Sequence, residues 1–232
     1  EPNLQNIPIR TENGRQIRKV FVPRSQEYIL VDADYSQIEL RVLAHISGDK
    51  GLIDTFKRNE DIHTRTASEV FGIEIKDVTP LMRGRAKAVN FGIVYGISDY
   101  GLSQDLKIPR KEAKKYIDNY FARYPGVKQY MTDIVETART DGYVKTIMNR
   151  RRYIPEITSR NAVNRNFGER IALNTPIQGS AADLIKMAMV KVAELIAGKE
   201  EEIKMLLQVH DELIFEVKED KLDFYAPKIK KI

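Results

Sequence analysis

The sequence predicts an α+β fold, in which an antiparallel sheet is interrupted by a long helical insertion. Short apolar runs typical of strands occur near the two ends of the chain, at residues 28–31, 205–209 and 213–217. Between about 60 and 175 the spacing of apolar residues is almost entirely helical. The strands are therefore far apart in the sequence and must be brought together by the fold.

The composition allows one large domain or two small ones. The chain has 232 residues, of which 42% are hydrophobic, enough to bury a sizeable core. It has no cysteine, which excludes disulfides, thiolate metal sites and a cysteine nucleophile. Its three histidines are too scattered for a zinc motif of the H-E-x-x-H kind.

Charge and hydropathy bear on partners and location. The net charge of +5 suits a polyanionic partner, although many proteins of this charge bind no nucleic acid. No apolar stretch is long enough to span a bilayer and the start carries no signal peptide, so we expect a cytoplasmic protein without membrane contacts. Because the first residue is Glu1 rather than methionine, we expect a piece of a longer chain.

The N-terminal region is predicted to lead into one strand and one helix. Residues 1–27 are punctuated by proline and glycine, which predicts extended segments and turns. After the strand at 28–31, Ser36 and Glu39 have the S-x-x-E form of a capping box, which predicts a helix that ends at Gly48. Asp34 is thereby placed where a strand gives way to a helix.

Helices are predicted along the middle of the chain. Thr79 and Pro80 form a helix start, with threonine as N-cap and proline at the first position. This helix should run to about Tyr95. Two more helices are expected at 110–123 and 126–140.

The C-terminal region is predicted to contain a further helix and a β-hairpin. Pro176 and Gly179 should interrupt the chain after a helix that carries Asn174, and a capped amphipathic helix should then cover 180–197. The last two strands are separated by His-Asp-Glu at 210–212, which places acids at the turn of the hairpin.

Asp34 and Asp211 are the candidate metal ligands. Hard cations such as Mg²⁺ prefer carboxylate oxygens, and a two-metal site needs carboxylates that bridge the ions. An acid at a strand end and an acid at a hairpin turn can meet at one edge of the same sheet. The alternative is that both are solvated turn residues. Asp32 and Glu212 are weaker candidates, as supporting acids or as surface acids.

The helix that starts at Pro80 carries a candidate nucleotide site. Arg83, Lys87, Phe91 and Tyr95 follow one another at steps of four, so they lie on one slowly drifting face. Cations can hold a triphosphate, and aromatic rings can pack on a base and a sugar. The alternative is a solvated cationic stripe followed by two core aromatics.

Three segments, in this order, resemble the sequence blocks of family A DNA polymerases, most closely those of the bacterial members. They are DYSQIELR from Asp34, R-x3-K-x3-F-G-x2-Y-G from Arg83, and VHDE from Val209. The likeness extends to NLQNIP from Asn3, DIH from Asp61, RRRY from Arg150 and QG at Gln178. It therefore covers nearly the whole chain.

The resemblance implies a fold and a reaction. The parts that bear the sheet, 1–59 and 176–232, correspond to a palm, and the helical part, 60–175, corresponds to fingers that close on a correct pair. The implied reaction is attack by a primer 3′-hydroxyl on the α-phosphate of a dNTP, in DNA replication and repair.

The same resemblance implies two Mg²⁺ ions and the groups that hold them. The expected ligands are Asp34, Asp211 and the main-chain carbonyl of Tyr35. Glu212 is expected to be a further catalytic acid beside them.

Resemblance also assigns the phosphate contacts. Arg83 and Lys87 are expected to bind the triphosphate with the help of His63, and Lys87 to protonate the leaving pyrophosphate. Gly84 departs from the family pattern, in which a larger residue follows this arginine.

For the sugar and the base, four more residues are implied. Phe91 should lie against the sugar, and Tyr95 should stack near the templating base. Glu39 should fill the space that a ribose 2′-hydroxyl would need, so that ribonucleotides are rejected by a clash. Gln37 belongs to the same nucleotide-binding set.

Contacts to the minor groove of the primer–template duplex are implied for a set of polar residues. Because the acceptors of this groove are nearly the same for every base pair, donors there test pair shape without reading sequence. The set is Asn3, Gln5, Asn6, Arg170, Asn174, Gln178 and His210. For the arginines at 150–152 two interpretations stay open, phosphate contacts to template or a solvated charge run.

The implied partners are primer–template DNA and dNTPs. The protein is expected to be a monomer whose parent chain adds a thumb and exonuclease-type domains, and the fragment alone should extend a primer poorly. Three other functions stay open: a two-metal nuclease, a nucleic-acid-binding module and a single-subunit RNA polymerase. A nuclease has no triphosphate to hold, and Glu39 favours DNA synthesis over RNA synthesis.

Overall fold

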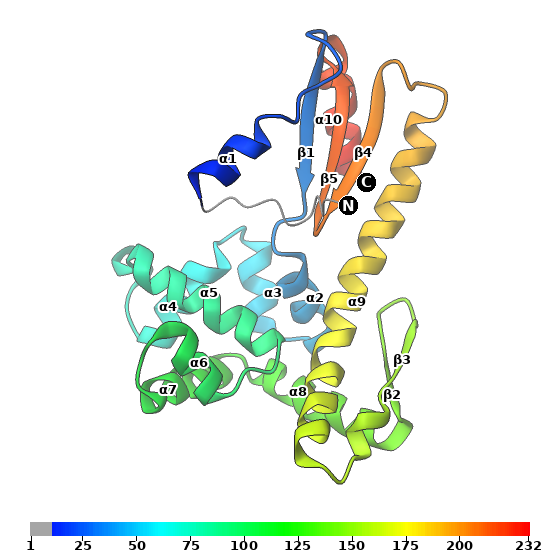
Figure 1. Ribbon diagram of the computed structural model, residues 1–232. Coiled ribbons are helices and arrows are strands. Elements are labelled where there is room, and N and C mark those ends of the chain that lie inside the picture. The colour runs from blue at the N-terminus through cyan, green and yellow to red at the C-terminus, as the bar shows by residue number, and fades with distance from the viewer. Residues whose placement is uncertain (1–10) are drawn as a thin grey trace. The chain divides into compact units, whose positions relative to one another are not determined.

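The computed structural model describes residues 11–232, which form two compact units (Figure 1). The sheet unit contains the chain up to Ser36 together with Ala182–Ile232, and the helical unit is Gln37–Ala181. The subdomain bounds expected from the sequence, at 59/60 and 175/176, stay a prediction.

Three antiparallel strands form the sheet of the sheet unit, in the order β1-β5-β4. Their bounds are Tyr28–Asp34 for β1, Ile203–Val209 for β4 and Glu212–Lys218 for β5. The fold class expected from the sequence, helices with an antiparallel sheet, is thus confirmed, and so is the hairpin of β4 and β5.

One face of this sheet forms the core of the sheet unit. The C-terminal part of α9 (Ala162–Ile196) and α10 (Leu222–Lys231) cover it (Figure 1). The buried residues of this core are Val192, Ile203, Leu213, Phe215, Val217 and Tyr225. Because side chains alternate along a strand, the other face of β1 carries Asp32 and Asp34.

The helical unit contains most of the helices. They are α2 (Ile38–Ser47), α3 (Lys50–Lys57), α4 (Ile62–Phe71), α5 (Pro80–Val94), α6 (Asp99–Leu106), α7 (Arg110–Arg123), α8 (Pro125–Asp141) and the first part of α9. Short 3₁₀ helices lie at Ile75–Asp77 and Pro155–Thr158, and a third, Glu219–Lys221, precedes α10 in the sheet unit. The strands β2 (Tyr143–Lys145) and β3 (Arg151–Tyr153) form a small hairpin.

Local chemistry explains several helix starts, as expected from the sequence. The hydroxyl of Thr79 accepts a hydrogen bond from the N–H of Met82 at 3.3 Å, and Pro80 opens α5. The expected bounds of α5, α7 and α8 are confirmed to within about one residue. Within 11–232, the helices are all too short or too polar to cross a bilayer.

One expectation about local structure is wrong because a short-range contact was missed. Within 1–27, a helix α1 (Glu12–Arg18) forms in place of turns, since the hydroxyl of Thr11 caps it by accepting from the N–H of Gly14. Residues 60–175 are almost entirely helical, as expected, apart from the short strands β2 and β3. Residues 1–10 lie outside the described part of the chain.

The N-cap of α2 lies one residue later than the Ser36 expected from the sequence. The N-cap of α2 is Gln37, which has a left-handed backbone (φ 56) and makes no side-chain capping bond. The chain has only three residues in which to turn from β1 into α2, and a left-handed residue achieves that turn. The helix does end at Gly48, whose φ of 62 suits glycine.

The expected break near Pro176 is absent, and α9 continues through it. A proline inside a helix removes one backbone hydrogen bond at a cost of about 3 kcal/mol. Here Ile177 is fully buried, and the Ser180 hydroxyl donates to the Pro176 carbonyl. Gly179 permits close packing, because a Cβ there would lie 2.7 Å from Thr146. Tertiary burial thus overrides the local signal.

Candidate functional site

Asp34 and Asp211 meet at one end of the sheet. Asp34 is the last residue of β1 and lies opposite Glu212, the first residue of β5. The two-residue turn before Glu212 contains Asp211, and the main-chain carbonyl of Asp211 accepts a hydrogen bond from the N–H of Tyr35 at 3.1 Å. His210 gives the turn its sharpness through a positive φ of 51. We call Asp32, Asp34, Asp211 and Glu212 the acidic end.

The carboxylates of the acidic end act on one another's pKa values. Burial, followed by the charges of Asp211 and Asp32, raises the pKa of Asp34 above its ordinary value. Burial and the charges of its three acidic neighbours likewise raise the pKa of Glu212, against a smaller opposing effect of Arg18. Like charges directly opposite on paired strands are destabilising, so this arrangement is costly in the free protein.

The donor chemistry of the acidic end fits a hard divalent cation. Carboxylates and main-chain carbonyls are the oxygen ligands that Mg²⁺ takes in proteins, and the excess of negative charge favours a cation. Among residues 11–232, no group of three or more acidic or histidine side chains has metal-binding geometry. By donor type, the groups that would suit such an ion are the carboxylates of Asp34 and Asp211 and the main-chain carbonyl of Tyr35.

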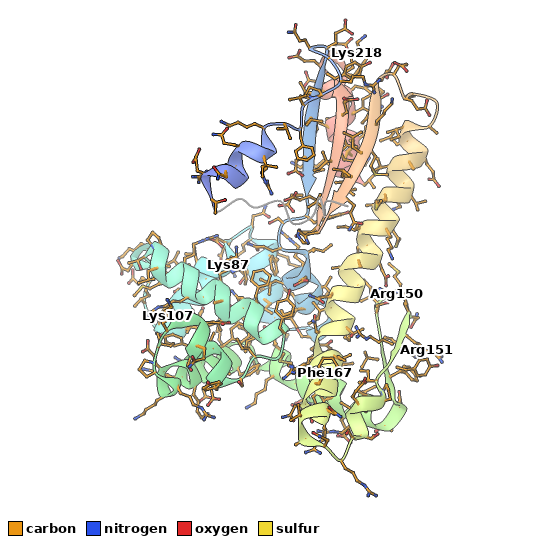
Figure 2. All side chains as sticks on the ribbon, in the orientation of Figure 1. Lys87, Lys107, Arg150, Arg151, Phe167 and Lys218 are labelled. Carbon is orange, nitrogen blue, oxygen red and sulfur yellow. The ribbon has the colours of Figure 1, made fainter. Side chains whose placement is uncertain are left out.

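In the helical unit, α5 carries two exposed cations. Lys87 lies on this helix (Figure 2), and its Nζ is 5.9 Å from the centre of the Phe91 ring. The Nε of Arg83 lies 2.5 Å from Oδ2 of Asp61, which is the N-cap residue of α4. The Phe91 ring lies 5.8 Å from the ring of His63. We call this surface the cationic face.

Asp61 is a strongly engaged carboxylate. It accepts hydrogen bonds from the Arg83 guanidinium, the Thr64 hydroxyl and the N–H of His63. Burial acts to raise its pKa, but these bonds outweigh burial and lower the pKa to about 2. Arg83 is therefore neutralised within the chain.

A buried polar chain lies behind His63. The Thr66 hydroxyl is 3.1 Å from Oδ1 of Asn90, and Nδ2 of Asn90 is 3.1 Å from Nδ1 of His63. Burial, opposed by Asp61 and then reinforced by Arg83 and Lys87, lowers the pKa of His63 to about 4. Sequence analysis missed Asn90 and Thr66. The available signal was a polar residue among the buried positions of α5.

The end of α5 is shaped by two glycines. A Cβ at Gly92 would lie 2.6 Å from Ile97. Gly96 has a φ of 65, and a Cβ there would lie 2.9 Å from Leu173 of α9. These contacts explain physically why the FGxxYG motif needs glycine at both places.

Tyr95, just after α5, joins residues from two other helices. Its hydroxyl donates to Oε2 of Glu39 at 3.2 Å and accepts from Nε2 of Gln178 at 3.1 Å. Burial, then the Glu39 charge, raises the pKa of Tyr95. Tyr95 is 40% exposed. Gln37 lies two residues before Glu39, at the N-cap of α2.

Because α9 is continuous, Arg170, Asn174 and Gln178 share one face of it, at steps of four residues. The Arg170 guanidinium lies 6.0 Å from the ring of Phe167 (Figure 2). Oδ1 of Asn174 is buried and has no hydrogen-bond partner among the described residues. Of the other residues expected at the duplex, His210 is exposed in the sheet unit, and Asn3, Gln5 and Asn6 lie outside the described residues.

The arginines at 150–152 differ in their environments. Nη2 of Arg150 donates to the Gly179 carbonyl at 3.0 Å. The Arg151 guanidinium lies 4.9 Å from the Tyr143 ring on the paired strand. Arg152 is exposed on β3. Figure 2 labels Arg150 and Arg151 on this hairpin. Both interpretations of the run stay open.

Comparison with known proteins gives consistent matches. The family model for DNA polymerase family A matches residues 1–232. DNA polymerase I of Geobacillus stearothermophilus is 58% identical over 96% of this chain, and that of Bacillus subtilis is 59% identical over 96%. The POL domain of Pol1 from M. smegmatis, solved in complex with a DNA primer-template and dNTP, is 51% identical over 99% of this chain, with a TM-score of 0.94.

The chain spans about a quarter of the length of these curated relatives, 26% and 25% respectively, and 41% of the solved chain. The family match nevertheless covers every residue of this chain. The likeness seen in the sequence blocks is therefore confirmed, and the chain belongs to DNA polymerase family A.

Proposed function

We propose that this chain carries the nucleotide-addition site of a DNA-directed DNA polymerase, which extends a primer on a template with dNTPs. The observation that carries the proposal is the cationic face, where two cations, a histidine and an aromatic ring lie together on and beside α5. A polymerase needs such a surface for a triphosphate, and a nuclease does not.

The arrangement of subdomains follows the family. The palm comprises about 1–59 and 176–232 and bears the acidic end, and the fingers comprise about 60–175 and bear the cationic face. Closure of the fingers on a correct pair excludes water and completes the site.

The triphosphate is bound by Arg83 and Lys87, with His63 as an additional donor. Arg83 has to exchange Asp61 for a phosphate oxygen or share its donors between them, since an arginine has five N–H groups. Lys87 is free of any carboxylate among the described residues and supplies the proton for the leaving pyrophosphate.

Asp34, Asp211 and the Tyr35 carbonyl would hold two Mg²⁺ ions, whose chemistry is to activate the primer 3′-hydroxyl and to stabilise the leaving pyrophosphate. Glu212 lies beside Asp34 and adds to the negative field there. The protein's own contribution is to fix the carboxylates on a rigid sheet before the substrate arrives.

Sugar selection and base positioning fall to the end of α5. Phe91 lies against the deoxyribose. Glu39, fixed by the Tyr95 hydroxyl, occupies the space of a ribose 2′-hydroxyl, with Gln37 nearby in the chain. Tyr95 has its open side toward the templating base.

The duplex is contacted through its minor groove by the polar face of α9. Arg170, Asn174 and Gln178 supply this face, and Asn174 has a buried oxygen that still lacks a partner among the described residues. Asn3, Gln5, Asn6 and His210 complete the set. The protein acts as a monomer, with a thumb and exonuclease-type domains in the parent chain.

The proposal is tested by single-nucleotide primer extension with the natural full-length protein. We expect Mg²⁺-dependent incorporation of dATP opposite thymine and much weaker incorporation of ATP. Preferred incorporation of ATP would assign the protein to RNA synthesis, and primer degradation without extension would assign it to hydrolysis. Glu39→Ala should relax the discrimination against ATP while dATP incorporation continues.

A further inference from the structure

The polar chain from Thr66 through Asn90 to His63 is deeply buried beside the cationic face. Thr66 and Asn90 are fully buried, and His63 is 3% exposed. Two helices supply the three side chains, because Thr66 and His63 lie on α4 and Asn90 lies on α5. Polar groups at such depth persist only when they are hydrogen-bonded.

The hydrogen bonds of this chain have a definite direction. The Thr66 hydroxyl donates to Oδ1 of Asn90, so the amide oxygen is taken and the amide NH₂ is turned toward His63. An amide NH₂ only donates. With the Asn90 amide in this orientation, Nδ1 of His63 accepts, and a neutral ring then carries its single proton on Nε2.

Other contacts hold the ring in place. The N–H of His63 donates to Oδ1 of Asp61 at 3.0 Å, which fixes the backbone, and the Phe91 ring lies 5.8 Å away, which limits rotation of the imidazole. Nε2 has no hydrogen-bond partner among residues 11–232. The charged groups that act on the ring are Asp61, Arg83 and Lys87.

We propose that Asn90 and Thr66 are positioning residues for nucleotide binding, which hold His63 as a neutral, directed Nε2–H donor for a phosphate oxygen. The inference rests on the proposed function, because it assigns the donor to the triphosphate. A neutral donor suits this place, since a third cation beside Arg83 and Lys87 would be repelled by them in the free protein. The lowered pKa of His63 keeps the ring neutral at physiological pH.

The tautomer can be measured without any nucleotide. Long-range ¹H–¹⁵N spectra of the natural full-length protein with labelled histidine distinguish a protonated from an unprotonated ring nitrogen, and His63→Gln identifies the signal. We expect Nδ1 unprotonated and Nε2 protonated. Asn90→Asp, which replaces the donor by an acceptor, should move a proton to Nδ1. A wild-type ring that is protonated on Nδ1, or that exchanges between tautomers, would overturn the inference.

Kinetics test the consequence for binding. Asn90→Asp should raise the KM for dNTP by about tenfold with little change in kcat, because a directed hydrogen bond to a charged group is lost in ground and transition state alike. Asn119→Asp is the matched control, since the Asn119 amide donates to a main-chain carbonyl in the same unit, away from the cationic face. It should leave KM unchanged.

Two further variants keep the test decisive. Thr66→Val removes the hydroxyl that holds the Asn90 amide, without adding charge. It should give a mixture of His63 tautomers and a smaller rise in the KM for dNTP. This variant replaces Asn90→Asp in the test if Asn90→Asp does not fold. In a His63→Ala background, Asn90→Asp should have no further effect on KM. Additive effects would contradict the inference, whereas a wild-type protein that adds no nucleotide would contradict the proposed function instead.

Discussion

The charged groups of the acidic end have like-charged neighbours, whereas on the cationic face Arg83 has a partner of opposite charge. At the acidic end, Asp34 and Glu212 lie opposite each other on paired strands and their pKa values are raised. On the cationic face, Arg83 is paired with Asp61, whose pKa is lowered to about 2, and burial lowers the pKa of His63 to about 4.

This difference shows what each region needs from its ligand. The acids of the acidic end raise one another's pKa values, so a bound cation would relieve their repulsion. On the cationic face, Arg83 is already paired within the chain, so an anion that binds it must offer better partners than Asp61 does. A rigid sheet can store the unfavourable charge of the first region because its core is well packed.

The largest expected effect comes from removing one acid. Asp34→Asn should lower the rate of nucleotide addition by about 10³-fold or more, because several kcal/mol of charge stabilisation depend on it. The same change should stabilise the free protein by about 0.5 kcal/mol, since the facing like charges are lost. Extension assays and urea unfolding measure the two effects.

Asp118→Asn is the control for that change, because Asp118 is exposed and, within residues 11–232, pairs only with Lys114 on the same helix. It should alter neither activity nor stability appreciably. An Asp34→Asn protein that is both active and less stable would show that the acidic end is an ordinary structural cluster.

The two regions should also give opposite pH dependences of stability. The pKa of His63 is lowered from about 6.5 in the unfolded chain to about 4, so its contribution is present above pH 6.5 and is lost as pH falls toward 4, on the order of 3 kcal/mol. Asp61 acts likewise below about pH 4, toward pH 2. The raised pKa values of Asp34 and Glu212 do the reverse, since their contribution is lost as pH rises through those values.

Urea unfolding from pH 4 to 8 separates these contributions. His63→Gln should reduce the loss of unfolding free energy on the acid side of the pH curve. Asp34→Asn should reduce the loss of unfolding free energy that the wild type shows as its acids ionise with rising pH. If His63→Gln leaves the stability below pH 6.5 unchanged, protonation of the buried imidazole is not the cause of the loss of stability in acid.

Divalent cations should stabilise only the first region. At ten times its Kd, Mg²⁺ should raise the free energy of unfolding by about 1.4 kcal/mol, and chelation should reverse the effect. Thermal unfolding of the Asp211→Asn variant should respond much less. An equal response in both proteins would mean that the cation binds elsewhere.

The smallest expected effect concerns α5 itself. A Cβ at Gly84 would meet nothing within 4 Å, so Gly84→Ala should stabilise the protein by about 0.5–1 kcal/mol through helix propensity. Gly92→Ala is the matched opposite, because its Cβ would clash with Ile97. If both changes lowered the free energy of unfolding equally, the low helix propensity of Gly84 would not be what limits the stability of α5.

The sequence predicted what local chemistry decides. Thr79 and Pro80 begin α5, as this pair does before many helices. Gly48 ends α2 because its backbone is left-handed. The order of strands and acids placed Asp34 and Asp211 at one sheet edge, where the structure has them.

What could not be predicted depends on tertiary contacts. The helix through Pro176 persists because its neighbours are buried, and Gly179 serves the packing of Thr146. Asn90 and Thr66 are 24 positions apart, so no local pattern reveals that they share a hydrogen bond. The pairing of Arg83 with Asp61 is equally non-local.

The most direct test of the division between the two regions measures dNTP affinity and the rate of addition in the same full-length protein. Asp211→Asn should retain most dNTP binding while addition falls by about 10³-fold. Lys87→Ala should weaken dNTP binding as well as slow addition. Undiminished addition by Asp211→Asn would contradict the account, whatever the binding of the nucleotide.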